Sequence, residues 1–182
     1  MGEIKPPSLV KLIVSMISAR EDLFKKAKEE MEKKFGPVDF QSPTLPFTYT
    51  RYYESEMGKN LKRKFFSFRS LIDPEEIAEV KLFTNELEQS FLYPNSKRRC
   101  INIDPGYLSS SKLVLATTKN YAHRIYLGKG IYAEVTLRYK GKGFKPWEWT
   151  YPDYRSEAYL QIFQEIRKIY RGQASIFDIS QS

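Results

Sequence analysis

Three side chains in the second half of the chain are of the types that transfer protons in enzymes: Asp104, His123 and Glu134. His123 is the only histidine, and histidine is the residue type whose unperturbed pKa lies closest to neutral pH. A carboxylate can act as a general acid or base once it lies within hydrogen-bond reach of a reacting group. We therefore take these three as the candidate catalytic residues. The sequence shows no convincing nucleophile, so binding with and without catalysis both stay open.

The same region carries cations and tyrosines that suit an anionic ligand. Lys112, Lys119 and Arg124 would hold a phosphate or carboxylate group. Tyrosine combines an apolar ring with a polar hydroxyl, which suits the rim of a pocket. We expect a mixed-charge cleft that binds an anionic or phosphorylated small molecule, such as a nucleotide. The sequence specifies no metal site, although a Mg²⁺ ion bridging a carboxylate and a phosphate would be compatible with this ligand. The other candidate ligand-binding residues are Tyr107, Tyr126, Tyr132 and Asp153.

Two elements must position these side chains. The first is a hairpin over residues 123–139, with Gly128-Lys129-Gly130 at its tip. The hydrophobic pattern favours a three-residue loop with Gly130 left-handed, and this register places His123 on the apolar face. The register pairs Leu127 with Ile131, Ile125 with Ala133, Tyr126 with Tyr132, Arg124 with Glu134 and His123 with Val135.

The second element is the strand that precedes Asp104. Residues 99–103 are predicted to form this strand, and Asp104-Pro-Gly is predicted to turn directly after it. Such a turn would present the carboxylate to a cleft, or use it in a structural Asx-turn. The following Ser109–Lys112 segment could cradle a phosphate with its amides.

The remaining elements predict the fold class. The first half has the order βαββαβ, which is typical of the ferredoxin-like arrangement. An antiparallel hairpin region and a C-terminal helix ending at Gly172 follow it, so we predict one α+β domain over residues 1–172 and a loose tail over 173–182. The first-half strands are predicted at 9–17, 47–54, 61–71 and 99–103, with helices ending at Phe35 and starting at Asp73.

The net charge of +8 leaves two alternatives to a small ligand. The segment Leu61–Arg69 interleaves cations and aromatics, as RNA-binding strands do, but the pattern favours apolar side chains inward with Lys and Arg outward. A basic face for RNA would need Lys62, Lys64, Lys97 and Arg98 on one surface. A protein-interaction surface would instead use exposed Trp147 and Trp149.

Cysteine usage and hydropathy indicate a cytoplasmic protein. Cys100 is the only cysteine, so no intramolecular disulfide forms, and a structural zinc site of the Cys/His type is excluded. We expect a buried, inert thiol. The longest apolar run, Leu9–Ile17, is too short to span a bilayer, and we expect no signal peptide.

Four stretches resemble a family of uncharacterised prokaryotic proteins of about this length. They are 104–108, 112–120, 123–136 and 149–155, and the resemblance covers nearly the whole chain. Members are catalogued as a domain of unknown function, and some carry the automatic label "GTP-binding protein". That label finds no support here, because the chain has neither a P-loop nor an Asn-Lys-x-Asp motif. The resemblance implies that the segments around Asp104, Lys112, Lys119, His123–Arg124, Glu134 and Tyr151–Tyr154 define the family.

Overall fold

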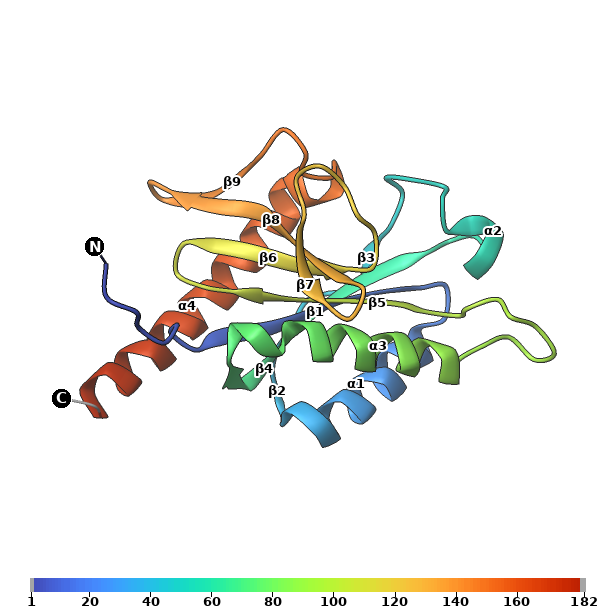
Figure 1. Ribbon diagram of the computed structural model, residues 1–182. Coiled ribbons are helices and arrows are strands. Elements are labelled where there is room, and N and C mark those ends of the chain that lie inside the picture. The colour runs from blue at the N-terminus through green and yellow to red at the C-terminus, as the bar shows by residue number, and fades with distance from the viewer. Residues whose placement is uncertain (1, 181–182) are drawn as a thin grey trace.

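A nine-stranded antiparallel sheet organises the protein. The computed structural model describes the backbone of residues 2–180 and the side chains of residues 2–174 (Figure 1). The main path of the sheet runs β2-β4-β1-β5-β6-β8-β7, while β3 pairs with β4 and β9 pairs with β8. The strands are β1 (Val10–Ser18), β2 (Val38–Gln41), β3 (Leu45–Pro46), β4 (Lys62–Ile72), β5 (Asn102–Leu108), β6 (Lys112–Thr117), β7 (Ile125–Gly128), β8 (Ile131–Lys140) and β9 (Gly143–Pro146).

Helices cover both faces of this sheet, which confirms the α+β class (Figure 1). The apolar side chains of α1 and α3 pack on one face, against Leu12, Val14 and Met16 of β1. Those of α4 pack on the other face, against Ile13 and Phe65. The helices are α1 (Glu21–Phe35), α2 (Glu54–Met57), α3 (Ile77–Ser90) and α4 (Glu157–Ser180), with short 3-10 turns at Pro74–Glu76 and Asp153–Arg155. Within residues 2–180, no helix is long and apolar enough to span a membrane.

The first-half elements agree with the sequence except for the second and fourth strands. Residues 47–54 were expected to be a strand because they are rich in Thr and Tyr. Instead, β4 pairs with β1 on one side and with β2 and β3 on the other. Phe47 leaves the sheet to pack with Ile17, Met57 and Leu61. Only four residues form β2, too few for a clear alternating pattern. The ferredoxin-like assignment stays a prediction.

Asp104 lies inside β5 and not in a turn after it, which corrects the expectation for Asp104-Pro-Gly. The strand tolerates Pro105 because pairing between β5 and β6 starts only at Gly106, opposite Leu115. At Gly106 the two backbones approach closely: a Cβ built there would lie 2.3 Å from the carbonyl oxygen of Val114. The turn follows instead at residues 109–111, where the Ser109 amide donates to the Lys112 carbonyl oxygen at 2.9 Å.

The second-half hairpin agrees with the predicted register except at its tip. Ile125 pairs with Ala133 and Tyr126 with Tyr132, as expected. Gly128 rather than Leu127 pairs with Ile131, so Leu127 is the extra residue of a β-bulge. The tip therefore has two residues, and both Lys129 and Gly130 have positive φ (53° and 77°).

The last helix is longer than predicted. We expected Gly172 to end it and a loose tail to follow, whereas α4 continues to Ser180. Gln173 holds this end of the helix on the sheet: it accepts from the buried Lys11 Nζ at 2.6 Å and donates to the Arg69 carbonyl oxygen at 2.7 Å. A single glycine in a helix costs only about 1 kcal/mol, so these contacts are sufficient to override the stop signal.

Replacing Gly106 tests the close approach of β5 and β6. Gly106→Ala should destabilise the protein by about 1–3 kcal/mol, because the added methyl group has to displace backbone. Gly143→Ala is the control, since a Cβ there meets nothing within 4 Å; we expect a change within about 0.5 kcal/mol. Urea unfolding of both variants measures the difference. Equal stabilities would contradict the packing described here.

Candidate functional site

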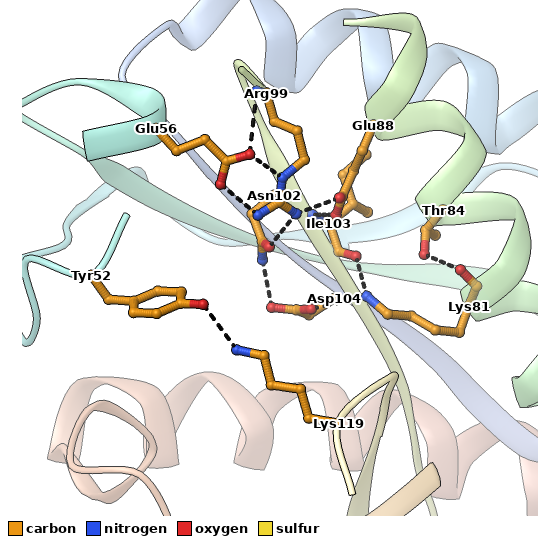
Figure 2. A network of polar contacts seen from close by, with 10 residues as sticks. All are labelled: Tyr52, Glu56, Lys81, Thr84, Glu88, Arg99, Asn102, Ile103, Asp104 and Lys119. Atoms are coloured by element: carbon orange, nitrogen blue, oxygen red, sulfur yellow. Dashed lines mark hydrogen bonds and ion pairs between the residues drawn. The ribbon is translucent and has the colours of Figure 1, made fainter. Parts of the chain in front are cut away.

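Asp104 lies at the centre of a polar network between β5 and α3 (Figure 2). Its carboxylate accepts from Lys81 Nζ at 3.1 Å and from the side-chain amide of Asn102 at 2.6 Å. Lys81 also donates to the carbonyl oxygen of Ile103 at 3.1 Å. The Lys81 side chain is only 6% exposed, whereas that of Asp104 is 31% exposed. Asp104 is therefore held from inside by a buried cation and keeps part of its carboxylate surface open.

Opposing effects act on the ionisation of Asp104. Burial alone would raise the pKa of this carboxyl, but the Lys81 ammonium, the Arg63 guanidinium and the Asn102 hydrogen bond outweigh it. The result is a pKa below the usual value for aspartate. Asp104 is thus an anion at neutral pH that can accept hydrogen bonds from a ligand.

An arginine-centred ion-pair network holds α2 beside β5 (Figure 2). Arg99 binds both carboxylate oxygens of Glu56 at 2.7 Å and donates to Glu88 at 2.6 Å. The buried Glu88 also accepts from the Ile103 amide at 2.6 Å. Burial raises the pKa of Glu88. Because Glu56 belongs to α2, this network fixes the segment that carries Tyr52 and Tyr53.

Tyr52 and Tyr53 precede α2 and link it to the loop that follows β6. The ammonium of Lys119 lies 3.3 Å from the Tyr52 hydroxyl and 4.7 Å from the centre of its ring. The Tyr53 ring lies 5.0 Å from that of Tyr52. Burial raises the pKa of the Tyr53 hydroxyl, and the neighbouring Asp104 charge raises it further. Lys119 and Asp104 therefore flank the same pair of tyrosines.

A buried carboxylate gathers the candidate residues of the hairpin. Glu134 is 3% exposed and accepts from Arg124 Nε at 2.9 Å, from Thr136 Oγ1 at 3.2 Å and from His123 Nε2 at 3.0 Å. The predicted Arg124–Glu134 contact is confirmed. His123 does not lie on the apolar face as expected, because a turn closed by the Arg124 amide and the Tyr121 carbonyl oxygen precedes β7. This turn directs both His123 and Arg124 toward Glu134.

His123 is also part of a stack of planar groups. Its ring lies between those of Tyr121 and Trp149, at centroid distances of 6.1 and 5.4 Å. Trp147 stacks on Trp149 at 5.1 Å, and the Arg138 guanidinium covers Trp147 at 4.2 Å. Both tryptophans are half-buried in this stack. They therefore hold the loop after β9 against the hairpin.

Arg124 joins the Lys119 segment to Tyr151. Arg124 donates to the carbonyl oxygen of Lys119 at 2.9 Å and to the Tyr151 hydroxyl at 3.4 Å. Burial is the main cause that raises the pKa of the Tyr53 hydroxyl, and the charges of Asp104 and Tyr151 add to it. We call the resulting surface the Asp104 patch; it consists of Asp104, Tyr52, Tyr53, Lys119, Arg124 and Tyr151.

Sheet register places Asp104 and Glu134 on one face. Gly106 pairs with Leu115, and Leu115 pairs with Glu134. Directly opposite residues share a face, as do residues two apart on a strand. Asp104 and Glu134 therefore both point to the face that α4 covers, with one strand between theirs. Two strand spacings and the two-residue offset along β5 put their Cα atoms about 12 Å apart.

The other predicted ligand-binding residues lie outside the Asp104 patch. Lys112 starts β6, whereas Lys119 follows its opposite end, so the strand separates them by about 17 Å. Tyr107 is packed against the core on the α1/α3 face. Asp153 is buried and accepts from Arg63 at 2.7 Å. The rings of Tyr126 and Tyr132 pair on the hairpin with centroids 5.1 Å apart.

Sequence reasoning missed the buried cations of the site. Arg63 was expected to point outward, but its side chain is 4% exposed and lies 4.6 Å from the Phe47 ring and 5.3 Å from the Tyr154 ring. It shares a strand face with Phe65, and this alternation was the available signal. Lys81 had no such signal, because it lies on a helix whose partner strand is distant in sequence. Cys100 is buried as expected, and burial raises its pKa.

The residues of the Asp104 patch line neither of two depressions of the surface. These depressions, of about 480 and 580 Å³, lie elsewhere: one between α1 and α3, the other beside β3. Neither depression therefore corresponds to the mixed-charge cleft that the sequence predicted. Within the described residues, no group of three or more His, Cys, Asp or Glu side chains could hold a metal ion.

The ionisation of Asp104 should be visible in acid unfolding. A carboxyl whose folded pKa is lowered contributes stability above its unfolded pKa, about 4, and loses it as pH falls through the folded pKa. Asp104→Asn should therefore be less stable than the parent at neutral pH. The difference in the free energy of unfolding between the two proteins should narrow between about pH 5 and pH 2. Urea midpoints across this range measure it. Glu148→Gln, at an exposed position, should follow the parent at every pH. A difference in the free energy of unfolding between parent and Asp104→Asn that stays constant with pH would contradict the lowered pKa of Asp104.

Comparison with known proteins identifies a family. No curated protein and no solved structure matches the chain. The model of a domain of unknown function, DUF4416, matches residues 8–170, which span β1 and nearly all the elements described above. Since this match covers most of the 182 residues, the chain belongs to the DUF4416 family.

Proposed function

We propose that the protein binds an anionic small molecule, such as a nucleotide or another phosphorylated metabolite, at the Asp104 patch. The observation that carries this proposal is the state of Lys119. Within the described residues, its ammonium contacts the Tyr52 hydroxyl and ring, and no carboxylate lies within ion-pair distance. A cation held over an aromatic ring without a counter-ion is suited to receive an external anion.

The neighbouring groups suit a ligand that also carries hydrogen-bond donors. Tyr52 and Tyr151 are 63% and 49% exposed, so their hydroxyls can donate to phosphate oxygens. The open part of the Asp104 carboxylate can accept from a hydroxyl or amino group. Arg124 has a different role, because Glu134, Lys119 and Tyr151 already occupy its donors. It positions the Lys119 segment.

Of the three candidate catalytic residues, His123 is best placed to move a proton. Glu134 is buried and fully engaged, so it is a positioning residue. A neutral imidazole that donates from Nε2 to Glu134 leaves Nδ1 as an acceptor, and the His123 side chain is 25% exposed. Acid–base chemistry at the Asp104 patch would therefore use His123, with Asp104 binding the ligand.

The alternatives have less support from individual contacts. An RNA-binding face needs free cations, but Lys62 pairs with Glu21. Arg98 donates to the carbonyl oxygen of Glu56 at 3.0 Å and lies over the Tyr93 ring. A protein-interaction surface built on Trp147 and Trp149 also has less support, because both rings already stack within the chain.

Removing the Lys119 charge tests the proposal. The parent should show thermal stabilisation by at least one ligand class in a screen of nucleotides, phosphosugars and inorganic phosphate. Lys119→Met should weaken that ligand about 10–100-fold, because a hydrogen bond to a charged group contributes about 1.5–3 kcal/mol. Titration calorimetry of parent and variant measures the change.

The matched control is Lys142→Met, at an exposed position in the β8–β9 turn. It removes the same charge from the protein and should leave affinity unchanged. If both variants weaken binding equally, the ligand responds to net charge and not to the Asp104 patch. Absence of stabilisation by every phosphorylated compound would also overturn the proposal.

A further inference from the structure

The stretch between Asp104 and Glu148 contains almost no acidic residue. It carries eight Lys or Arg residues, and its one carboxylate, Glu134, is 3% exposed and paired within the protein. Soluble proteins usually intersperse charges of both signs on their surface. The surface that this stretch forms is therefore uniformly positive, and a field of one sign attracts partners of the opposite charge.

The sheet register gathers part of this charge in a row. Lys112 of β6 pairs with Arg138 of β8, and Arg138 pairs with Lys145 of β9. Directly opposite residues point to the same face, so the three side chains form a row across three strands, about 10 Å long at the Cα atoms. Lys140 lies two residues after Arg138 on the same strand and shares this face.

The row lies on the face of the sheet opposite α4. The core that α1 and α3 form on this face includes Ala116 and Ile131, which lie at the other ends of β6 and β8. Lys140 and Lys145 are accordingly exposed. The orientation of the row follows from its neighbours along the strands, which pack against α4: Leu113, Leu137 and Phe144.

Aromatic rings, and not carboxylates, hold two guanidinium groups at this end of the sheet. That of Arg138 lies 4.2 Å from the centre of the Trp147 ring. That of Arg167 in α4 lies 3.4 Å from the centre of the Tyr139 ring, and its Nε donates to the Ser110 carbonyl oxygen at 2.9 Å. Within residues 2–174, no carboxylate lies within ion-pair distance of either guanidinium or of the lysines in the row. Cations positioned in this way can receive an external anion with little loss of side-chain entropy.

The turn between β5 and β6 adds hydroxyl groups beside these cations. Ser110 and Ser111 are exposed and directly precede Lys112. The Tyr139 amide donates to the Ser111 carbonyl oxygen at 2.7 Å, which fixes the turn against β8. Lysine, arginine and serine side chains are the groups with which proteins contact nucleic-acid phosphates. We call this surface the basic end of the sheet; its cations are Lys112, Arg138, Lys140, Lys145 and Arg167.

We propose that the basic end of the sheet binds the phosphate backbone of double-stranded nucleic acid. Its cations extend across three strands, so a small anion would meet part of them, whereas a polymer with regularly spaced phosphates would meet all of them. The Trp147 ring is covered by Arg138 on one side and by Trp149 on the other, and Arg167 covers Tyr139. Neither ring therefore offers a platform on which an unpaired base could stack, and a duplex, whose bases are already paired, fits this surface better than a single strand.

An anionic membrane is the other partner that a basic surface could meet. Peripheral binding to lipid uses apolar side chains that enter the interface. Among the described residues, no exposed large apolar side chain belongs to β6, β8, β9 or the turn before β6. The basic end therefore suits a polyanion in water. Because contacts to phosphates carry no sequence information, we expect binding that does not depend on the base sequence.

Fluorescence anisotropy of the full chain with short labelled duplexes tests the proposal. Two DNA duplexes of unrelated sequence and an RNA duplex of equal length show whether DNA, RNA or both are bound. The logarithm of the affinity should fall with the logarithm of salt concentration with a slope of about −4, because each phosphate contact contributes about −0.9. A parent that binds neither kind of duplex, or whose affinity does not change with salt, would overturn the proposal.

The double variant Lys140→Met/Lys145→Met removes two of the expected phosphate contacts. At about 0.1 M salt, two contacts account for roughly a 10–100-fold change in affinity, so binding should weaken by this factor and the salt slope should fall by about 2. The matched control is Lys59→Met/Lys97→Met, which removes the same charge from exposed positions that precede β4 and β5, at the opposite end of the sheet. It should keep the affinity of the parent within about threefold. All four side chains are exposed, and circular dichroism should show the parent fold in both variants.

Three results would contradict this assignment. The first is equal weakening by the two double variants, which would mean that the nucleic acid responds to net charge. The second is unchanged binding by Lys140→Met/Lys145→Met. The third is tighter binding to a single strand, or to vesicles of phosphatidylserine and phosphatidylcholine, than to a duplex. Lys119→Met should bind the duplex as the parent does, so this proposal and that for the Asp104 patch are tested separately.

Discussion

A carboxylate in the interior of a protein has to be paired, and this constraint shapes the second half of the chain. Glu134 is 3% exposed, and desolvation of an unpaired charge there would cost several kcal/mol. Arg124 and His123 meet this requirement, but only if the chain turns sharply before β7. That turn determines the course of residues 118–124. It brings Lys119 to Tyr52, although Lys119 takes no part in the pairing.

The same constraint acts on the other half of the Asp104 patch. Glu88 is buried on α3 and needs Arg99, which in turn binds Glu56 of α2. The short helix α2 has four residues and little apolar surface of its own, so this ion pair helps to keep it in place. Two buried glutamates on different elements thus position the two sides of one surface. Lys119, which has no carboxylate within ion-pair distance among the described residues, lies where those sides meet.

The sequence predicted the elements whose signals are local, and missed those that depend on tertiary contacts. Helix α1 has a clear apolar stripe, β1 is a continuous buried apolar run, and Gly130 has the expected left-handed conformation. The Arg124–Glu134 contact followed from hairpin register alone. Lys81 and the α2 tyrosines could not be predicted, because their roles arise from contacts between residues far apart in the chain. Asp104 was identified as a candidate, but the turn predicted directly after it was wrong, because Pro105 is tolerated inside β5 where pairing with β6 has not yet begun.

One connection, residues 118–128, links the proposed ligand site to the edge of the sheet. Its first part supplies Lys119 to the Asp104 patch, and its last part is the open edge β7. Arg124 lies between them and donates to the Lys119 carbonyl oxygen as well as to Glu134. Restraint applied at β7 therefore reaches Lys119 through one buried guanidinium. A ligand at Lys119 would therefore bind a segment that the Arg124–Glu134 pair already fixes in place.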